Sequence, residues 1–171
     1  MLRKRAPKAR PDEAQAADPA AALAAAVRAL SQRDYCSREL SARLTSQGYR
    51  AEAVESALAD LIERRYLDDA RYAQQYIAYH ADRGQGPLRI ARELLERGLS
   101  EGLIDAALDE YAQAHGDWSR LAREVRIRRF GLDSPGDWAQ KTKQARFLQY
   151  RGFSTDHIRS ALGQDALGEA D

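Results

Sequence analysis

The feature that most constrains this chain is a pattern of six positions around a glycine, which occurs three times at the offsets −8, −4, 0, +1, +6 and +10. The first copy consists of Leu40, Leu44, Gly48, Tyr49, Val54 and Leu58. The second consists of Ile90, Leu94, Gly98, Leu99, Ile104 and Leu108. The third consists of Gln144, Leu148, Gly152, Phe153, Ile158 and Leu162, with glutamine at the first apolar position. Apolar residues four apart on either side of a fixed glycine predict a helix, a left-handed glycine end and a second helix.

The spacing of these glycines sets the size of the repeat. They lie 50 and then 54 residues apart, which accommodates about three helices in each repeat. No segment shows the alternation of apolar and polar residues that marks a half-buried strand. We therefore predict an all-α protein of nine helices in three tandem repeats, at residues 19–67, 68–116 and 117–163. Stacked helical repeats act through a shared surface, so function is sought there before any pocket.

The two ends of the chain differ from the repeats. Residues 1–18 contain five basic residues and two prolines without apolar periodicity, which predicts a disordered basic arm. Residues 164–171 form an acidic tail. No run of eighteen apolar residues and no signal-peptide pattern occurs, so we expect no membrane partner. The single cysteine, Cys36, is expected to be a half-buried apolar residue and fits a cytoplasmic location.

Helix boundaries and buried faces can be predicted within each repeat. In the first repeat, Leu23, Val27 and Leu30 form one stripe on a helix over residues 19–32, and Ser37 is the expected cap of the next helix. The inner face of the third helix is expected to consist of Val54, Leu58, Leu61 and Ile62.

The third repeat carries its own helix signals. Asp117 and Ser154 are expected caps, and Ser134-Pro135 is the expected start of the middle helix. Because Gln144 breaks the apolar pattern, Ala145 or Trp138 is expected to fill its site.

The chain contains no recognisable catalytic or metal-binding pattern. Its histidines, His80, His115 and His157, are scattered and lack metal-ligand spacing. Asp68 and Asp69 form the most conspicuous carboxylate pair, but at a predicted helix start we interpret them as a cap rather than a metal site. We therefore expect neither enzymatic activity nor a cofactor.

Paired helices joined at a glycine also resemble a helix-turn-helix, which reads DNA with its second helix. The corresponding helices here are acidic, with Glu52, Glu55, Asp60 and Glu63 in the first repeat and Glu101, Asp105, Asp109 and Glu110 in the second. Acidic helices are repelled by phosphates, so sequence-specific DNA recognition is disfavoured.

Basic residues concentrate on other helices of the second and third repeats. Residues 51–115 carry 13 acidic against 7 basic residues, whereas residues 117–162 carry 5 acidic against 10 basic. The middle helices of stacked repeats can form one continuous face, which would be a docking surface for an acidic partner. Solvated charged faces that serve no partner are the alternative. The candidate partner-binding residues are Arg89, Arg92, Arg97, Arg123, Arg126, Lys141, Lys143, Arg146 and Arg151.

Three sequence blocks carry a family resemblance. They are Tyr66-Leu67-Asp68-Asp69-Ala70-Arg71-Tyr72, then Gly84-x-Gly86-Pro87-x-x-Ile90-x-x-Glu93-Leu94-x-x-x-Gly98, then Lys141-x-Lys143-x-x-Arg146-Phe147-Leu148-x-Tyr150-Arg151-Gly152-Phe153. In this order, over about residues 22–163, they closely resemble the RecX family of bacterial regulators. One departure is Arg65, which stands where the family usually has glycine.

The resemblance implies a fold and a function. The fold is three tandem three-helix units in an elongated, curved molecule. The function is to bind RecA and its filaments on single-stranded DNA, and to inhibit ATP hydrolysis, strand exchange and the co-protease activity behind the SOS response. A nucleic-acid-binding protein that acts through phosphate contacts, with single- or double-stranded DNA as partner, is the second hypothesis. A helical scaffold with another partner is the third.

Overall fold

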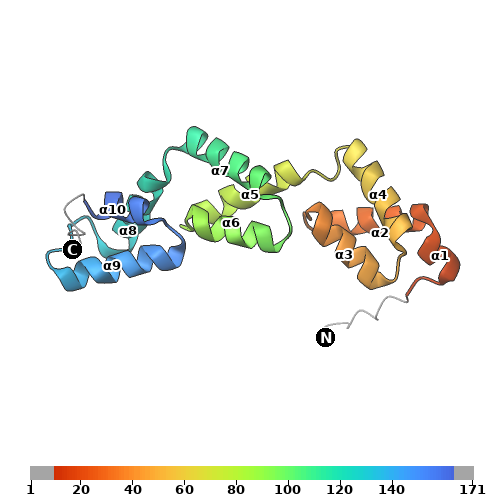
Figure 1. Cartoon of the computed structure of the whole chain (residues 1–171), viewed down its shortest axis with the longest axis horizontal. Coiled ribbons are helices and arrows are strands. Elements are labelled where there is room, and N and C mark those ends of the chain that lie inside the picture. The colour runs from red at the N-terminus through yellow and green to blue at the C-terminus, as the bar shows by residue number, and fades with distance from the viewer. Residues whose placement is uncertain (1–9, 164–171) are drawn as a thin grey trace, which may run out of the picture. The chain divides into compact units, whose positions relative to one another are not determined.

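The computed structural model describes residues 10–163, and these form ten α-helices and no strands. The chain divides into two compact units, Met1–Tyr72 and Ala73–Asp171. The first unit contains α1 (Glu13–Ala17), α2 (Pro19–Leu30), α3 (Ser37–Gln47) and α4 (Ala51–Glu63), and α5 (Asp69–Asp82) begins in it (Figure 1). The second contains α6 (Pro87–Glu96), α7 (Glu101–His115), α8 (Trp118–Phe130), α9 (Trp138–Arg151) and α10 (Thr155–Leu162). The predicted all-α class is confirmed.

The repeated glycines have the backbone conformation that the pattern predicts. Gly48, Gly98 and Gly152 have φ angles of 104°, 90° and 93°, in the left-handed region that side chains with a Cβ atom avoid. Each follows the middle helix of a repeat, namely α3, α6 or α9. The predicted sequence of helix, left-handed glycine and helix is therefore confirmed in all three repeats.

The predicted disordered arm is wrong for its last residues, because α1 lies within it. The Asp12 carboxylate caps this helix by accepting a 2.8 Å hydrogen bond from the Gln15 N–H. Ala16 is buried, and its carbonyl accepts a 2.8 Å hydrogen bond from the Arg50 N–H at the start of α4. With α1, the described residues form ten helices, one more than predicted. Residues 1–9 and the acidic tail lie outside the described residues.

Alanines, rather than the larger apolar residues, form the buried face of α2. The expected stripe is wrong, since Val27 is 48% exposed and Leu23 and Leu30 are only partly buried. Small side chains allow helix axes to approach closely, and α2 packs mainly on α4. Ile62 of α4 is likewise exposed, and Leu58 only partly buried. The alanines of this contact are Ala22, Ala25, Ala26 and Ala29 on α2, with Ala53 and Ala57 on α4.

The start of α3 is capped from a distant part of the chain. Cys36, not Ser37, is the N-cap residue, and its side chain makes no capping hydrogen bond. Instead, the Asp69 carboxylate accepts a 2.7 Å hydrogen bond from the Ser37 N–H. Cys36 is fully buried rather than half-buried, and burial raises the pKa of its thiol.

The rest of the Asp68–Tyr72 block is also structural. The Asp68 carboxylate accepts a 3.0 Å hydrogen bond from the Arg71 N–H and so caps α5, as predicted for one member of the pair. The Arg71 guanidinium donates to the carbonyls of Arg65 and Tyr66 at 3.2 Å. It thereby braces a turn in which Arg65 has a φ of 58°, a left-handed conformation that glycine adopts more readily than a residue with a Cβ atom. The Tyr72 hydroxyl donates to Glu39 of α3 at 3.4 Å.

The third repeat differs from its prediction in two places. Helix α9 begins at Trp138 rather than at Ser134-Pro135, because the Asp137 carboxylate caps it by accepting a 2.7 Å hydrogen bond from the Gln140 N–H. Neither Ala145 nor Trp138 replaces Gln144. Gln144 is itself 6% exposed, and its side-chain oxygen accepts a 3.4 Å hydrogen bond from Arg126 of α8. Ser154 caps α10 as predicted, in a reciprocal capping box with His157.

Candidate docking surface

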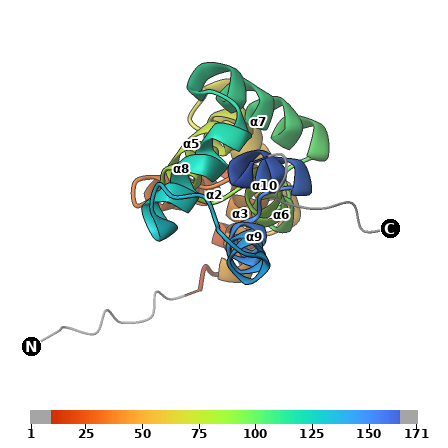
Figure 2. The same cartoon turned by 90° about the vertical axis from the view of Figure 1, so that its left-hand side faces the viewer.

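In the second unit, the start of α6 is fixed against the end of α9. The Gly86 N–H donates to the Arg151 carbonyl at 2.8 Å, and the Leu88 N–H donates to the Gly152 carbonyl at 3.0 Å. A Cβ atom on Gly86 would collide with the backbone of Gly152 and Phe153. The two middle helices therefore lie end to end, as Figures 1 and 2 show from two directions. The expectation that middle helices adjoin holds for repeats two and three.

Helix α9 carries an exposed stripe that leads toward this junction. Lys143, Arg146 and Tyr150 are spaced i, i+3 and i+7, which places them on one helix face. All three are exposed, and Tyr150 is 77% accessible to solvent. Lys143 and Arg146 form no ion pair with any residue between 10 and 163. Their charges are thus directed to solvent.

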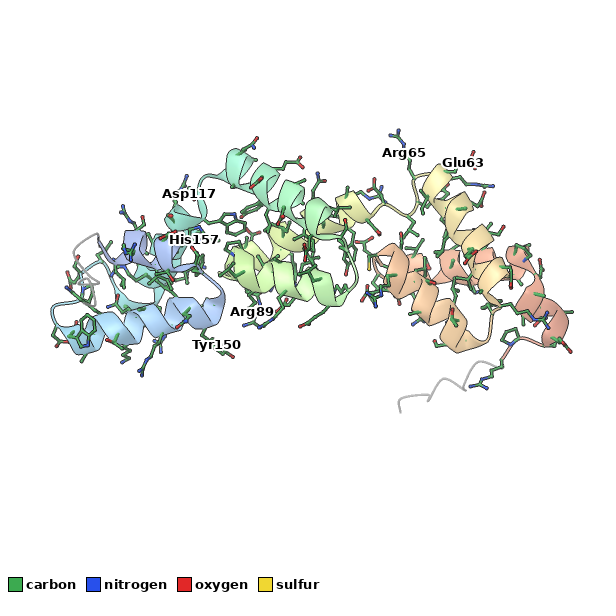
Figure 3. The ribbon with its side chains drawn as sticks, in the orientation of Figure 1. Glu63, Arg65, Arg89, Asp117, Tyr150 and His157 are labelled. Carbon is green, nitrogen blue, oxygen red and sulfur yellow. The ribbon has the colours of Figure 1, made fainter. Side chains whose placement is uncertain are left out.

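Helix α6 continues the basic side chains beyond the junction. The Arg89 guanidinium lies 2.9 Å from the Glu93 carboxylate, which also accepts a 2.6 Å hydrogen bond from the Tyr76 hydroxyl. Burial would raise the pKa of Glu93, but the hydrogen bonds from Tyr76 and Arg89 outweigh it and hold that pKa below its ordinary value. Arg92 is more open, because its side chain is 69% exposed and lies 3.8 Å from Glu96. In Figure 3, Arg89 and Tyr150 project side by side at the junction. We call Arg89, Arg92, Lys143, Arg146 and Tyr150 the basic edge.

The remaining candidate residues have other surroundings. Arg97 donates a 2.8 Å hydrogen bond to the Glu93 carbonyl, and its guanidinium lies 4.5 Å from the Tyr76 ring centre. Arg151 donates a 3.1 Å hydrogen bond to the Arg83 carbonyl and covers Phe147. Both brace the fold. Lys141 is half-buried, and Arg123 is exposed on α8.

The prediction that Arg126 contacts a partner is wrong. Arg126 is 5% exposed and donates to the carbonyls of Asp133 at 3.0 Å and Leu132 at 3.5 Å, in addition to Gln144. It therefore holds the loop before α9 from inside the repeat. One sequence signal could have revealed this role, since Arg126 adjoins Val125 on the face of α8 that also presents Trp118 and Ala122.

A pocket of about 380 Å³ lies beside the basic edge, at the junction of α6, α9 and α10. Leu88, Arg89, Arg92, Ala145, Gln149, Tyr150, Gly152, Phe153, Ser154, Thr155 and Ile158 line it. Between residues 10 and 163, no group of three or more histidine, cysteine, aspartate or glutamate side chains is placed to hold a metal ion. Within the same range, no helix is both long and apolar enough to cross a lipid bilayer.

Comparison with known families accounts for the three repeats. Residues 22–61, 68–108 and 119–162 match the first, second and third three-helix domains of RecX. The chain belongs to the RecX family. A curated relative from Halorhodospira halophila, named regulatory protein RecX, is 42% identical over 137 residues, which are 80% of this chain and 83% of the relative. A second, from Vibrio vulnificus, is 40% identical over 141 residues, covering 82% and 90% of the two chains.

Solved RecX structures have the same fold. The crystal structure of RecX from Lactobacillus salivarius aligns with a TM-score of 0.74 at 22% identity, over 87% of this chain and 96% of that one. Another RecX crystal structure aligns with a TM-score of 0.70 at 24% identity, over 86% and 73% of the two chains. The chain is thus a RecX-type regulatory protein built from three-helix domains, and the basic edge lies on the second and third of them.

Proposed function

We propose that this chain binds RecA and RecA filaments on single-stranded DNA, and that it inhibits their ATPase, strand-exchange and co-protease activities. Membership of a family of regulatory proteins supports the proposal. The observation that carries it is the basic edge. Its two helices are fixed end to end by backbone hydrogen bonds, and among residues 10–163 Lys143 and Arg146 form no ion pair.

The geometry supplies a physical mechanism for inhibition. A partner with periodic acidic surfaces, such as a filament, can engage several repeats of one chain at once. Each contact can be weak, because linked contacts gain affinity from their high effective concentration. Exposed charges also accelerate the encounter with an oppositely charged partner. Bound in this way, the chain obstructs the filament surface that a second DNA or a protein substrate must reach.

The test is a charge reversal on the basic edge. We expect Lys143→Glu combined with Arg146→Glu to raise the concentration needed to inhibit the DNA-dependent ATPase of RecA about tenfold, which corresponds to about 1.4 kcal/mol. Added salt should weaken inhibition by the wild-type chain more than by the variant, because exposed charges are screened over about 10 Å at 0.1 M. Helix content and Tm should change little, since both side chains are exposed.

A matched control reverses two other exposed charges of the same unit. Arg120→Glu with Arg159→Glu alters the net charge equally, but these arginines pair with Glu124 and Asp156 on α8 and α10. The control should inhibit RecA like the wild type. If the Lys143 and Arg146 variant inhibits at wild-type concentrations with the wild-type salt response, the basic edge is not the docking surface.

Direct nucleic-acid binding through phosphates is the second candidate function. The exposed side chains of Lys143 and Arg146, which form no ion pair in the described part of the chain, favour it, because cationic side chains of this kind bind the phosphates of nucleic acids. Binding to RecA without DNA, compared with binding to DNA without RecA, separates the two functions. Binding to DNA alone, with none to RecA, would replace the first proposal by the second.

A further inference from the structure

The pocket beside the basic edge has walls that are already in place. Its floor includes Phe153 and Ile158, which belong to the buried core of the third repeat. One wall begins at Leu88, whose N–H is bonded to the Gly152 carbonyl across the junction. The contact between Gly86 and Gly152 is closer than any Cβ atom would allow. Backbone contacts and core residues therefore fix this part of the pocket before any ligand binds.

The lining combines an open aromatic face with cationic groups. Tyr150 is 77% exposed although it is a large aromatic residue. The Arg89 guanidinium carbon lies 5.9 Å from the centre of that ring, and the Arg92 side chain is 69% exposed. No carboxylate lines the pocket. Glu93 and Glu96 lie on α6 outside it, where they pair with Arg89 and Arg92.

The polar groups of the lining are neutral hydrogen-bonding side chains. Gln149 offers both a donor and an acceptor, and Ser154 and Thr155 offer hydroxyl groups at the start of α10. An exposed ring, nearby guanidinium groups and neutral polar groups are the features with which proteins hold single-stranded nucleic acid, by base stacking and phosphate contact. A volume of about 380 Å³ lies in the range of pockets that hold a small ligand.

We propose that this pocket binds one nucleotide of a single strand, with the base stacked on Tyr150 and the adjoining phosphate held by Arg92. A duplex is excluded from this mode because its base faces are already stacked on one another. The inference deepens the second candidate function, direct nucleic-acid binding, because it assigns a pocket that recognises a base as well as a phosphate. It therefore stands or falls separately from inhibition of RecA.

Fluorescence anisotropy with labelled oligothymidylate, and with a duplex of the same length, tests the site. We expect Tyr150→Ala to weaken single-strand binding about fivefold or more, the effect of losing one stacked base, with less than about a twofold change for the duplex. Tyr150→Phe should bind like the wild type because it keeps the ring. Arg92→Ala should weaken binding and reduce the slope of log affinity against log salt by about 0.7, as for one lost phosphate contact.

Trp138→Ala is the matched control. Trp138 lies on α9 like Tyr150 and is 65% exposed, but it does not line the pocket. This variant should bind the single strand like the wild type, and circular dichroism melting should show every variant folded. The proposal is overturned if Tyr150→Ala binds the single strand like the wild type, or loses single-strand and duplex affinity equally. It is also overturned if Tyr150→Ala binds DNA normally but no longer inhibits RecA, since the pocket would then hold a protein side chain.

Discussion

The ends of α3 and α9 show how one sequence pattern meets two different structural demands. Both helices end at a left-handed glycine, Gly48 or Gly152. A Cβ atom on Gly48 would make only an ordinary contact with Pro11, at 3.5 Å. A Cβ atom on Gly152 would collide with Arg89 of the neighbouring repeat. Gly48 is therefore required for its backbone angle alone, whereas Gly152 is required for the angle and for the contact that unites two repeats.

Alanine substitutions of the two glycines, made one at a time, test this difference. The largest loss of stability is expected for Gly152→Ala, in the third repeat. Gly48→Ala should lower the free energy of unfolding by about 1 kcal/mol, the cost of a Cβ atom at positive φ. Gly152→Ala adds a steric clash of about 1–3 kcal/mol and should therefore lower it by about 2–4 kcal/mol. Urea unfolding followed by circular dichroism measures both. Equal losses of unfolding free energy in the two variants would mean that Arg89 moves away from the new Cβ atom at residue 152 without an energetic cost.

A third left-handed position, Arg65, should give a smaller effect of opposite sign. Its φ of 58° is unfavourable for a residue with a Cβ atom, and its guanidinium forms no ion pair within residues 10–163 that a glycine would lose. We expect Arg65→Gly to raise the free energy of unfolding by up to about 1 kcal/mol, reduced by the greater entropy of glycine in the unfolded chain. Arg64→Gly is the control. Arg64 has an ordinary φ of −80°, so this variant should have a lower free energy of unfolding than the wild type. A loss of stability in Arg65→Gly contradicts the interpretation of strain.

The smallest expected effect is a pH dependence confined to the second unit, which holds all three histidines. Burial lowers the pKa of His157, although the Asp117 and Asp156 carboxylates oppose the change (Figure 3). Burial also lowers the pKa of His80. Between these lowered pKa values and about pH 6.5, the unfolded chain binds more protons than the folded chain. The contribution of the two histidines to the free energy of unfolding is therefore complete above about pH 6.5 and is lost as the pH falls through the pKa values of the folded state.

Thermal melting at about pH 7.5 and about pH 5.5 measures this dependence. The wild-type Tm should fall on acidification. His157→Gln keeps a side chain able to complete the capping box but cannot titrate, so its Tm should fall less. An unchanged fall in His157→Gln would assign the effect to His80.

The glycine pattern and the caps at Asp68 and Ser154 could be predicted because both are local. A left-handed helix end needs a residue without a Cβ atom, and Asp68 precedes a helix whose orphan N–H groups need an acceptor. The Asp69–Ser37 bond is not local, since it joins residues 32 positions apart. The buried alanine face of α2 could not be predicted either. Alanine occupies most of that helix, so hydrophobicity does not distinguish one face from another.

The candidate surface was predicted in part, for a similar reason. Charge identifies basic helices but not which side chains are directed inward, so Arg126 was assigned to the surface. Gln144 broke the apolar pattern on one helix and Arg126 broke it on the facing helix, and two polar residues on facing helices are the expected mark of a buried pair. Tyr150 shares a face with Lys143 and Arg146, a spacing visible in the sequence. That its ring stands exposed beside Arg89 depends on where the next repeat docks.

The backbone hydrogen bonds between α6 and α9 also bear on how the molecule folds. In repeat proteins, the coupling between neighbours determines whether repeats unfold singly or together. Here the third repeat supplies the acceptors for the N–H groups of Gly86 and Leu88 at the start of α6. If the third repeat unfolds, both donors lose their partners and a helix of the second repeat loses its starting turn. We therefore expect these two repeats to unfold as a single cooperative block, the minimal segment in which the basic edge exists.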